Sequence, residues 1–440
     1  MIKIVKFGGS SVANATQFKK VKKIVKSDPT RQFVVVSASG KANKDDNKIT
    51  DLLYLCHAHL KYNITCDNIY GMIEDRFKSI KADLNLKYDI ESDLANLKAE
   101  LDKSIDVDYL VSRGEFLTGK LMSEYLGYHF VDAKDIIFYN YDGTFDYPKM
   151  KIAFDEIVKD HPQLVIPGFY GSLPNGAIKI MSRGGGDVTG SIMANIIEAD
   201  VYENWTDVSG ILMADPRIVK HPKQIEVITY SELRELSYMG ASVLHEEAIF
   251  PVKRKDIPIH IKNTNRPEDA GTIIKDAASE SDNKTVITGI AGTKNFSIIT
   301  VKKAHMSNEV GLIKNALDVI DKFGLSIEHL PTGIDSFSIV IETAAVKPVL
   351  YDVILNIKEK CHPDDISVVE NVALIATVSR TMKSRSGMSG RLFTTLGKHG
   401  INISMISQTS DEMNIIVGVD NKDYENTIRA IYDEFEGDKQ

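Results

Sequence analysis

The chain opens with Ile2-Lys3-Ile4-Val5-Lys6 and turns at Gly8-Gly9-Ser10-Ser11. The first run is short and apolar, which favours a buried strand, and the glycine-rich turn precedes a helix expected over residues 15–26. A second strand is expected at 33–37, where Phe-Val-Val-Val-Ser is β-branched and nearly all apolar, as in parallel strands covered on both faces. Two more strands are expected at 164–166 and 201–205. Strands separated by helices imply right-handed βαβ units, so we predict an α/β domain over residues 1–280 whose mostly parallel sheet lies between helices.

A helical insertion is expected within this domain, over residues 51–108. Apolar residues there recur at helical spacing among many charges, which predicts helices at 51–60, 67–80 and 90–103. The stretch Cys56-His57-Ala58-His59 suggests a metal site, but residues two apart do not share a helix face, so a plain helix is favoured. We therefore interpret the insertion as part of the first domain and not as a separate catalytic domain.

An internal repeat occupies the last third of the chain, after a polar linker at 276–284. The stretch 324–330 (Gly-Leu-Ser-Ile-Glu-His-Leu) aligns with 400–406 (Gly-Ile-Asn-Ile-Ser-Met-Ile) at an offset of 76 residues. Each copy has the pattern of a helix ending in glycine, a strand, a polar turn and a second strand. We predict two ferredoxin-like βαββαβ modules, over 285–365 and 366–440, with the strand at 285–291 a candidate to pair with the second module.

The composition bounds the classes of function. A length of 440 residues predicts two to four domains. The 53 basic and 61 acidic residues give a net charge of −8, so no whole-molecule attraction to nucleic acid or to an anionic membrane is expected. No run approaches the roughly 18 apolar residues of a membrane span, the start lacks the apolar core of a signal peptide, and three cysteines fit a reducing compartment. We predict a cytoplasmic protein. If its ligand is an anion, a local site must bind it, because the whole molecule does not attract anions.

Four segments carry more glycine, hydroxyl groups and charge than packing requires. In the first, Lys6 precedes two glycines whose backbone N–H groups can approach an anion, an order that differs from a Walker A loop. The other three are 112–116 (Ser-Arg-Gly-Glu-Phe), 182–187 (Ser-Arg-Gly-Gly-Gly-Asp) and 205–217, which follows a strand at the sheet edge where α/β proteins bind ligands. Each segment alone is compatible with an ordinary turn, an acid that complements a helix dipole, or a capped loop.

In this order, the four segments resemble the amino-acid kinase superfamily, and the first three resemble the aspartate kinases more specifically. The stretch 36–40 (Val-Ser-Ala-Ser-Gly) and the C-terminal pair of modules, which resemble ACT domains, extend the likeness over nearly the whole chain. The resemblance implies transfer of the γ-phosphoryl group of ATP, bound with Mg²⁺, to the β-carboxylate of L-aspartate. The product is 4-phospho-L-aspartate, and in the family this is the first step of lysine, threonine and methionine biosynthesis.

The resemblance also implies roles for individual residues, all read from the family motifs. Those expected to bind ATP are Lys6, Gly8, Gly9, Ser10, Thr206, Asp207, Leu212 and Arg217. Those expected to bind aspartate are Ser37, Thr50, Glu115 for the ammonium, Arg183 for the α-carboxylate, and Gly186. Lys6 and Asp187 are the expected catalytic residues. No protein ligand for the metal is singled out.

The chain departs from the family pattern after the nucleotide segment. The family has Gly-Ala-Lys-Val-Leu-His-Pro, whereas this chain has Gly-Ala-Ser-Val-Leu-His-Glu at 240–246. Ser242 replaces a lysine expected near the nucleotide, and Glu246 replaces a proline. The change bears on how tightly ATP binds and leaves the reacting atoms untouched.

The acceptor explains why no general base, and no catalytic histidine, is expected. A carboxylate with a pKa of about 3.9 is already ionised at neutral pH. The difficulty is bringing one anion onto another, so catalysis is expected to rest on positioning and on charge neutralisation by Mg²⁺, Lys6 and the N–H groups of the glycine loops.

The C-terminal modules are expected to be regulatory. ACT domains in the family pair across subunits and bind a pathway amino acid, so the resemblance implies a homodimer or homotetramer. The residues expected to meet an effector are Asn308, Ser326, Glu328 and Asp335. Acidic residues favour lysine, threonine remains open, and simple dimer packing is the alternative.

Two other functions stay open. One is a kinase of the same superfamily that acts on glutamate or another acyl acceptor, which the segment around Arg183 and the ACT-like tail disfavour. The other is a non-catalytic amino-acid sensor. Ser242 supports it, whereas the intact residues of the site oppose it: Lys6, Glu115, Arg183 and Asp187. An added homoserine dehydrogenase domain is not expected, because the chain ends soon after the second repeat.

Overall fold

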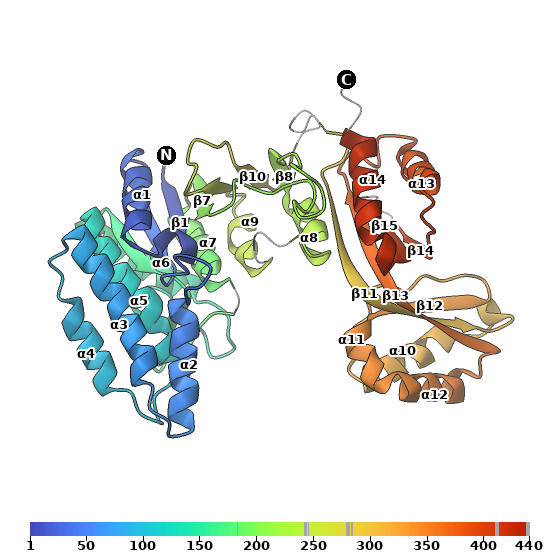
Figure 1. Ribbon diagram of the computed structural model, residues 1–440, viewed down its shortest axis with the longest axis horizontal. Coiled ribbons are helices and arrows are strands. Elements are labelled where there is room, and N and C mark those ends of the chain that lie inside the picture. Colours follow the sequence, from blue (N-terminus) through green and yellow to red (C-terminus); the bar gives the residue numbers. More distant parts are fainter. Residues whose placement is uncertain are drawn as a thin grey trace. The chain divides into compact units, whose positions relative to one another are not determined.

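The computed structural model describes residues 1–182, 184–241, 244, 246–278, 282, 285–409 and 413–436. The chain divides into two compact units (Figure 1). The first comprises residues 1–211, 226–230 and 243–278, and the second comprises residues 212–225, 231–242 and 279–440. Residues 212–225 and 231–242, which precede the predicted linker at 276–284, therefore belong to the second unit.

The first unit is built on an eight-stranded sheet with the order β3-β4-β2-β1-β7-β9-β10-β8. All neighbouring pairs are parallel except β9 and β10, which confirms the mostly parallel sheet. The strands are β1 (Lys3–Phe7), β2 (Arg31–Val36), β3 (His129–Phe130), β4 (Leu164–Pro167), β7 (Val201–Thr206), β8 (Val227–Thr229), β9 (Ile259–Asn263) and β10 (Thr272–Lys275). A small hairpin joins β5 (Tyr170–Ser172) to β6 (Ile178–Ile180). The four strands expected from the sequence are therefore the adjacent strands β4, β2, β1 and β7.

Helices cover this sheet. They are α1 (Ala15–Lys26), α2 (Ile49–Lys61), α3 (Asp67–Leu84), α4 (Ile90–Ala99), α5 (Val107–Leu126), α6 (Tyr147–Asp160), α7 (Gly185–Ile197) and the short α9 (Phe250–Lys253). Helices α2, α3 and α4 stand side by side in Figure 1 and pack with α5 through fully buried residues such as Leu53, Tyr70 and Phe77. The predicted helical insertion is thus a layer of helices that shares its core with the domain.

Two helices begin earlier than the sequence patterns predict, since these patterns favour one helix that begins at Glu115 and another that begins at Thr189. The helix that contains Glu115 begins at Val107, where the Asp106 side chain accepts a hydrogen bond from the Tyr109 N–H group. Glu115 therefore lies in the middle of α5, and it does not complement a helix N-terminus. Helix α7 begins at Gly185, inside the second glycine loop, because Gly184 adopts a left-handed conformation with φ of 74° that starts the helix there.

The second unit contains a single five-stranded sheet with the order β12-β11-β13-β15-β14. Its strands are β11 (Gly289–Lys302), β12 (Ser336–Glu342), β13 (Asp365–Val378), β14 (Met405–Ser407) and β15 (Asn414–Asp420). Strands β11 and β13 are 14 residues each and pair antiparallel along their whole length. The two repeats therefore share these strands, with residues 289–293 of β11 pairing with 374–378 of β13.

Helices of the second unit are α8 (Tyr230–Tyr238, whose first residue belongs to the first unit), α10 (Leu312–Lys322), α11 (Thr343–Val346), α12 (Leu350–Cys361), α13 (Met388–Lys398) and α14 (Tyr424–Glu436). The predicted glycine caps are present, since Gly324 and Gly400 follow α10 and α13 with φ of 64° and 67°. The strand expected after each glycine is reduced. In the first repeat it is reduced to isolated bridges, from His329 to Val340 and from Thr332 to Phe337, and in the second it is the three-residue β14.

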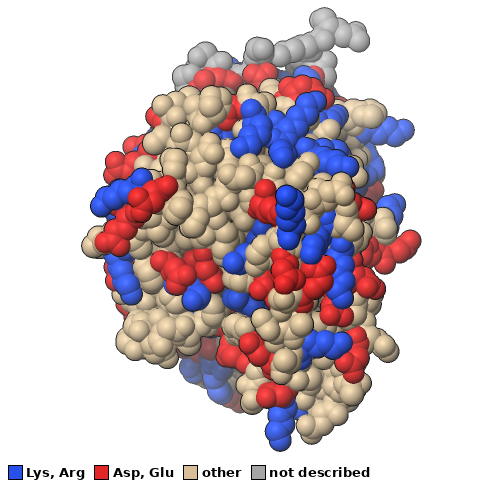
Figure 2. All heavy atoms as spheres, turned by 90° about the vertical axis from the view of Figure 1, so that its left-hand side faces the viewer, with Lys and Arg blue, Asp and Glu red and all other residues tan. Residues whose placement is uncertain are grey.

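The surface carries both signs of charge. On the face that Figure 2 shows, Lys and Arg side chains are interspersed with Asp and Glu side chains. None of the described helices combines the length and hydropathy needed to cross a membrane.

Candidate active site

A cavity of about 630 Å³ lies at the carboxyl ends of β1, β2, β4 and β7. Because these four strands are parallel neighbours, the turns that follow them meet at one edge of the sheet. Helix α5 adds Glu115 from the side. Eleven residues predicted from the sequence line this cavity: Lys6, Gly8, Gly9, Ser10, Ser37, Thr50, Glu115, Gly186, Asp187, Thr206 and Asp207.

A buried ion pair lies at the centre of the cavity wall. The Lys6 ammonium is 2.5 Å from Oδ1 of Asp187, and the side chains are only 9% and 17% exposed. Asn204 Nδ2 donates a second hydrogen bond, of 2.8 Å, to the same oxygen. Asp187 thereby holds the Lys6 ammonium at the place where β1 ends and α7 begins. The other carboxylate oxygen, Oδ2, has no partner among the described residues.

The glycine loops approach each other closely. A Cβ atom at Gly186 would lie 2.7 Å from Ser37 Oγ and 3.3 Å from Lys6 Cε. A Cβ atom at Gly40 would lie 2.6 Å from the Gly9 carbonyl carbon. Any side chain at these two positions would push the loops apart, so the glycines keep backbone N–H groups, including those of the first turn of α7, at the cavity.

Glu115 is the buried acid of the site. Its side chain accepts a hydrogen bond from the Ala38 backbone, while Oε2 has no hydrogen-bond partner among the described residues. Burial raises the pKa of Glu115 to about 8, although the Ala38 amide and the Arg113 charge act in the opposite direction. A buried carboxylate without a cation is costly, so the site favours a ligand that brings positive charge to Glu115.

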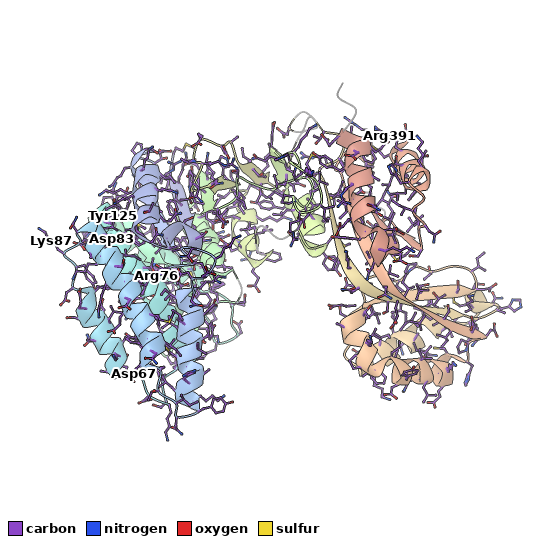
Figure 3. All side chains as sticks on the ribbon, in the orientation of Figure 1. Asp67, Arg76, Asp83, Lys87, Tyr125 and Arg391 are labelled. Carbon is purple, nitrogen blue, oxygen red and sulfur yellow. The ribbon has the colours of Figure 1, made fainter. Side chains whose placement is uncertain are left out.

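The loop that follows β2 is held by the helical layer. Arg76 of α3, labelled in Figure 3, donates hydrogen bonds to the Gly40 carbonyl (2.8 Å) and to both carboxylate oxygens of Asp46 (2.5 Å each). Burial alone would raise the pKa of Asp46, but the amides of Ala42 and Asn47 and the Arg76 charge lower it below its usual value. Arg76 therefore positions the 40–48 loop, from which Gly40, Lys41 and Lys48 line the cavity.

Several residues that line the cavity or support its wall were not predicted. Phe169 follows β4 and has φ of 78°, a strained conformation for a non-glycine residue that is often found at functional sites. Asn204 was detectable as a polar residue inside an apolar strand, and Phe169 as the residue that follows a strand end. Arg76 had no local signal, because its partners are at least 30 positions away in the sequence.

Some predicted residues do not join this cavity in the described part of the structure. Arg183 and Ser242 lie outside the described residues. Leu212 and Arg217 belong to the second unit, where Arg217 pairs with Asp215 at 2.6 Å.

The donor set of the cavity suits a nucleotide with its metal. Asp187 Oδ2 and the Asp207 carboxylate are oxygen ligands of the kind that Mg²⁺ prefers, and Mg²⁺ is usually held by one or two carboxylates together with substrate phosphates. Among the described residues, no group of three or more His, Cys, Asp or Glu side chains is arranged to hold a metal without such phosphates.

The predicted effector residues fall into two groups in the second unit. Asp335 Oδ1 accepts a hydrogen bond of 2.8 Å from the His305 amide, which ties it to the segment that contains Asn308. Glu328 instead accepts a hydrogen bond of 2.5 Å from the Tyr238 hydroxyl of α8. Ser326 is exposed in the loop after α10.

Comparisons with known proteins agree with this architecture. A profile described as "Amino acid kinase family" matches residues 1–263, and a profile described as "ACT domain" matches residues 375–435. Aspartokinase 3 of Bacillus subtilis is 36% identical over 451 aligned positions, which cover 99% of this chain and 98% of the relative.

Solved structures extend the likeness to three dimensions. The crystal structure of an aspartate kinase from Clostridium acetobutylicum, described as an allosteric enzyme, has 47% identity and a TM-score of 0.90, covering 99% of this chain and 100% of the other. Aspartokinase III of E. coli has the same fold at 24% identity and a TM-score of 0.75, with 99% of each chain covered. It has been solved in complex with aspartate and ADP, and in complex with lysine and aspartate.

Proposed function

The chain belongs to the aspartokinases of the amino acid kinase family and is thus an ATP-dependent phosphotransferase; from this premise we propose that it phosphorylates L-aspartate. The γ-phosphoryl group of ATP passes to the β-carboxylate, and the products are ADP and 4-phospho-L-aspartate. The observation that carries this proposal is the shared cavity, which is lined by the Lys6–Asp187 pair, by two glycine loops and by the buried Glu115 carboxylate, whose Oε2 has no hydrogen-bond partner among the described residues. The ADP and aspartate bound by E. coli aspartokinase III support the same pair of ligands.

Lys6 and the loop amides supply the charge that the reaction needs. The β-carboxylate of aspartate is ionised at neutral pH, so it attacks the γ-phosphorus directly and no base must remove a proton. Negative charge develops on the equatorial oxygens of the transferring group, where the Lys6 ammonium and the N–H groups of the glycine loops stabilise it. Asp187 and Asn204 keep Lys6 oriented. Asp187 and Asp207 are the residues that would hold Mg²⁺, which would neutralise the phosphate charge.

Opposite charges orient the acceptor. Glu115 binds the α-ammonium group, and Arg183 binds the α-carboxylate through a planar fork. With both α-groups held, the β-carboxylate is the group left to face ATP. Glutamate is one methylene longer. With its α-groups held in the same place, its side-chain carboxylate would extend past the position from which it can attack the γ-phosphorus.

A coupled assay of ADP release tests this function. The full-length protein is supplied with ATP and Mg²⁺, and with aspartate, glutamate or no acceptor. We expect release that depends on aspartate and yields a hydroxylamine-reactive acyl phosphate. Release with glutamate alone would identify a different kinase, and no release with any acceptor would favour a non-catalytic sensor.

We propose further that the second unit binds lysine and that the enzyme is feedback-inhibited in the cytoplasm as a homodimer or homotetramer. The acidic side chains of Glu328 and Asp335 support an effector with an extra ammonium group, as does the lysine bound by E. coli aspartokinase III. Calorimetry with lysine and with threonine distinguishes the two effectors, and a Glu328→Ala variant tests the site. If neither amino acid binds, feedback through this unit is wrong.

A further inference from the structure

A second cavity of the first unit is separate from the candidate active site. It has a volume of about 530 Å³, within the usual range for small-molecule sites. Its wall is formed by residues of the 139–147 turn, the end of β6, α7 and α9. Of the residues that the structure describes, Ser182 alone lines both cavities.

Four aromatic rings dominate the wall: Tyr139, Phe145, Tyr147 and Phe250. The centroids of Tyr139 and Phe145 are 4.7 Å apart, and those of Phe145 and Tyr147 are 6.4 Å apart. Phe250 is 52% exposed, so about half of its side chain is open to solvent. A ligand with an apolar ring would cover these surfaces and remove them from water.

The aromatic wall is built on a well-ordered turn. The Asn140 amide donates a hydrogen bond of 2.8 Å to the Thr144 carbonyl, and Asp142 accepts bonds from both the amide and the hydroxyl of Thr144. Gly143 has φ of 84°, which the turn requires and which glycine adopts without strain. The rings are therefore pre-organised, which lowers the cost of binding.

Two residues of opposite charge, Arg254 and Glu247, line the same cavity as the aromatic rings. The Arg254 guanidinium lies 5.9 Å from the Tyr147 centroid and forms no ion pair within the described part of the chain. Glu247 accepts a hydrogen bond from the Ser182 hydroxyl. Tyr139 is 93% buried, and its hydroxyl group has no hydrogen-bond partner among the described residues. The cavity thus offers one cation, Arg254, and one anion, Glu247, beside an aromatic wall.

We propose that this cavity binds a free amino acid with an aromatic side chain, whose ring lies against Phe145 and Tyr147, whose carboxylate meets Arg254 and whose ammonium meets Glu247. Arg254 and Glu247 line the same cavity and carry charges opposite to those of the two ends of a zwitterion, and the aromatic rings suit its side chain. Because Glu247 also bonds Ser182 at the edge of the active-site cavity, occupancy changes the aspartate KM. This kinetic consequence rests on the proposed function, whereas the binding does not.

Calorimetry of the full-length protein with L-phenylalanine tests the site, in the presence of saturating lysine and aspartate. Two analogues serve as probes of the charges: 2-phenylethylamine lacks the carboxylate, and 3-phenylpropionate lacks the ammonium. We expect L-phenylalanine to bind and each analogue to bind about tenfold more weakly or worse, the effect of losing one charge-assisted contact. No binding at about 10 mM, or equal binding of all three compounds, would overturn the proposal.

Variants locate the binding. Arg254→Met is expected to weaken L-phenylalanine about tenfold and to leave 2-phenylethylamine unchanged. Lys255→Met is the matched control, because the neighbouring Lys255 pairs with Glu198 and does not line the cavity. Phe145→Ala is expected to weaken both compounds. If Arg254→Met and Phe145→Ala both left the affinity for L-phenylalanine unchanged, the ligand would bind elsewhere and the proposed site would be wrong. If L-phenylalanine bound but the aspartate KM did not change, the proposed link through Ser182 would be wrong.

Discussion

At the scale of single residues, Lys6 is the group on which the proposed chemistry depends most. It is nearly buried and held by Asp187 at 2.5 Å, so its charge is already in place before substrates arrive. We expect Lys6→Ala to lower kcat by roughly 10²–10⁴-fold, the usual effect of losing one pre-organised electrostatic group. Steady-state kinetics measure this effect.

The matched control for Lys6 lies on the same strand. Lys3 pairs with Asp28 at 2.8 Å and with Glu203 at 3.3 Å, at the other end of β1. Lys3→Ala should lose some stability and keep its kcat. Equal kcat values in the two variants would remove Lys6 from the mechanism.

Glu115 predicts a pH dependence of aspartate binding. Burial raises its pKa to about 8, so below that pH the free protein holds Glu115 mostly protonated. Binding of an ammonium group requires the carboxylate and therefore expels a proton. We expect the aspartate KM to fall as pH rises from 6 towards about 8, and Glu115→Gln to show a high KM with no such slope. Glu124→Gln, on the same helix, is the control that should keep the slope.

The same pKa shift has a consequence for stability. The folded-state pKa of Glu115, about 8, lies above the unfolded value of 4.5, so the folded protein binds more protons between these values. The contribution of Glu115 to stability is therefore fully present below pH 4.5 and is lost as pH rises through about 8. Thermal unfolding without ligands should show Glu115→Gln more stable than the unsubstituted protein at pH 8.5, and little different at pH 5.

At the scale of elements, helix α3 controls the loop after β2. Arg76 of this helix donates hydrogen bonds to both Gly40 and Asp46, and the loop carries Gly40, Lys41 and Lys48 to the cavity. We expect Arg76→Met to raise the aspartate KM and to lower kcat by about tenfold, because the loop loses charge-assisted hydrogen bonds. Arg76→Lys should recover part of the activity, since one ammonium reaches Asp46 but cannot replace the planar fork.

A control on the same helix separates position from charge. Lys78 is exposed, and its Nζ atom lies 3.6 Å from Glu74 Oε1. Lys78→Met should keep both kinetic constants. If Arg76→Met behaved like Lys78→Met, the helical layer would have no part in shaping the site.

Helix α8 is joined to the sheet of the second unit by a buried acid. Glu232 is fully buried and accepts hydrogen bonds from the Thr288 hydroxyl (2.5 Å) and the Arg380 guanidinium (3.1 Å). Removing one partner of a buried pair typically costs about 3–5 kcal/mol. In Glu232→Ala, hydrogen exchange should show faster exchange of the β13 amides near Thr377, whereas Glu370→Ala, at an exposed position on β13, should leave it unchanged.

At the scale of the whole molecule, the proposed inhibition by lysine requires a reciprocal effect of aspartate on lysine binding. If lysine weakens aspartate binding by some factor, aspartate must weaken lysine binding by the same factor. Calorimetric titration of lysine, with and without aspartate and a non-hydrolysable ATP analogue, should give a Kd ratio equal to the ratio of aspartate Kd values measured with and without lysine. Lysine binding that ignores aspartate would contradict allosteric coupling.

The hydrogen bond between Glu328 and Tyr238 allows a test of whether Glu328 binds the lysine effector. Its carboxylate accepts a hydrogen bond from Tyr238, so an effector ammonium competes with that hydroxyl group. Tyr238→Phe should therefore tighten lysine binding, and Glu328→Ala should abolish it. A Tyr238→Phe variant with unchanged lysine affinity would separate Glu328 from the effector.

Local patterns in the sequence were sufficient for the strands and for the motif residues. The apolar runs predicted β1, β2, β4 and β7, and the residues that follow each run reach the same cavity because parallel strands end at one edge. The patterns were poorer at helix starts, as Glu115 and α7 show, because a helix begins at a cap and not at the first residue that carries function.

The amino-acid sequence alone determined the α/β domain, the repeated modules and the two glycine loops, because these follow from the spacing of apolar and glycine residues. Only the folded structure decided that the repeats share one sheet through β11 and β13, that Arg76 holds the loop beside the cavity, and that Glu115 is buried with Oε2 lacking a hydrogen-bond partner among the described residues. Such features depend on contacts between residues far apart in the chain. Burial, close approach and the desolvation of charge are properties of those contacts, and no local pattern encodes them.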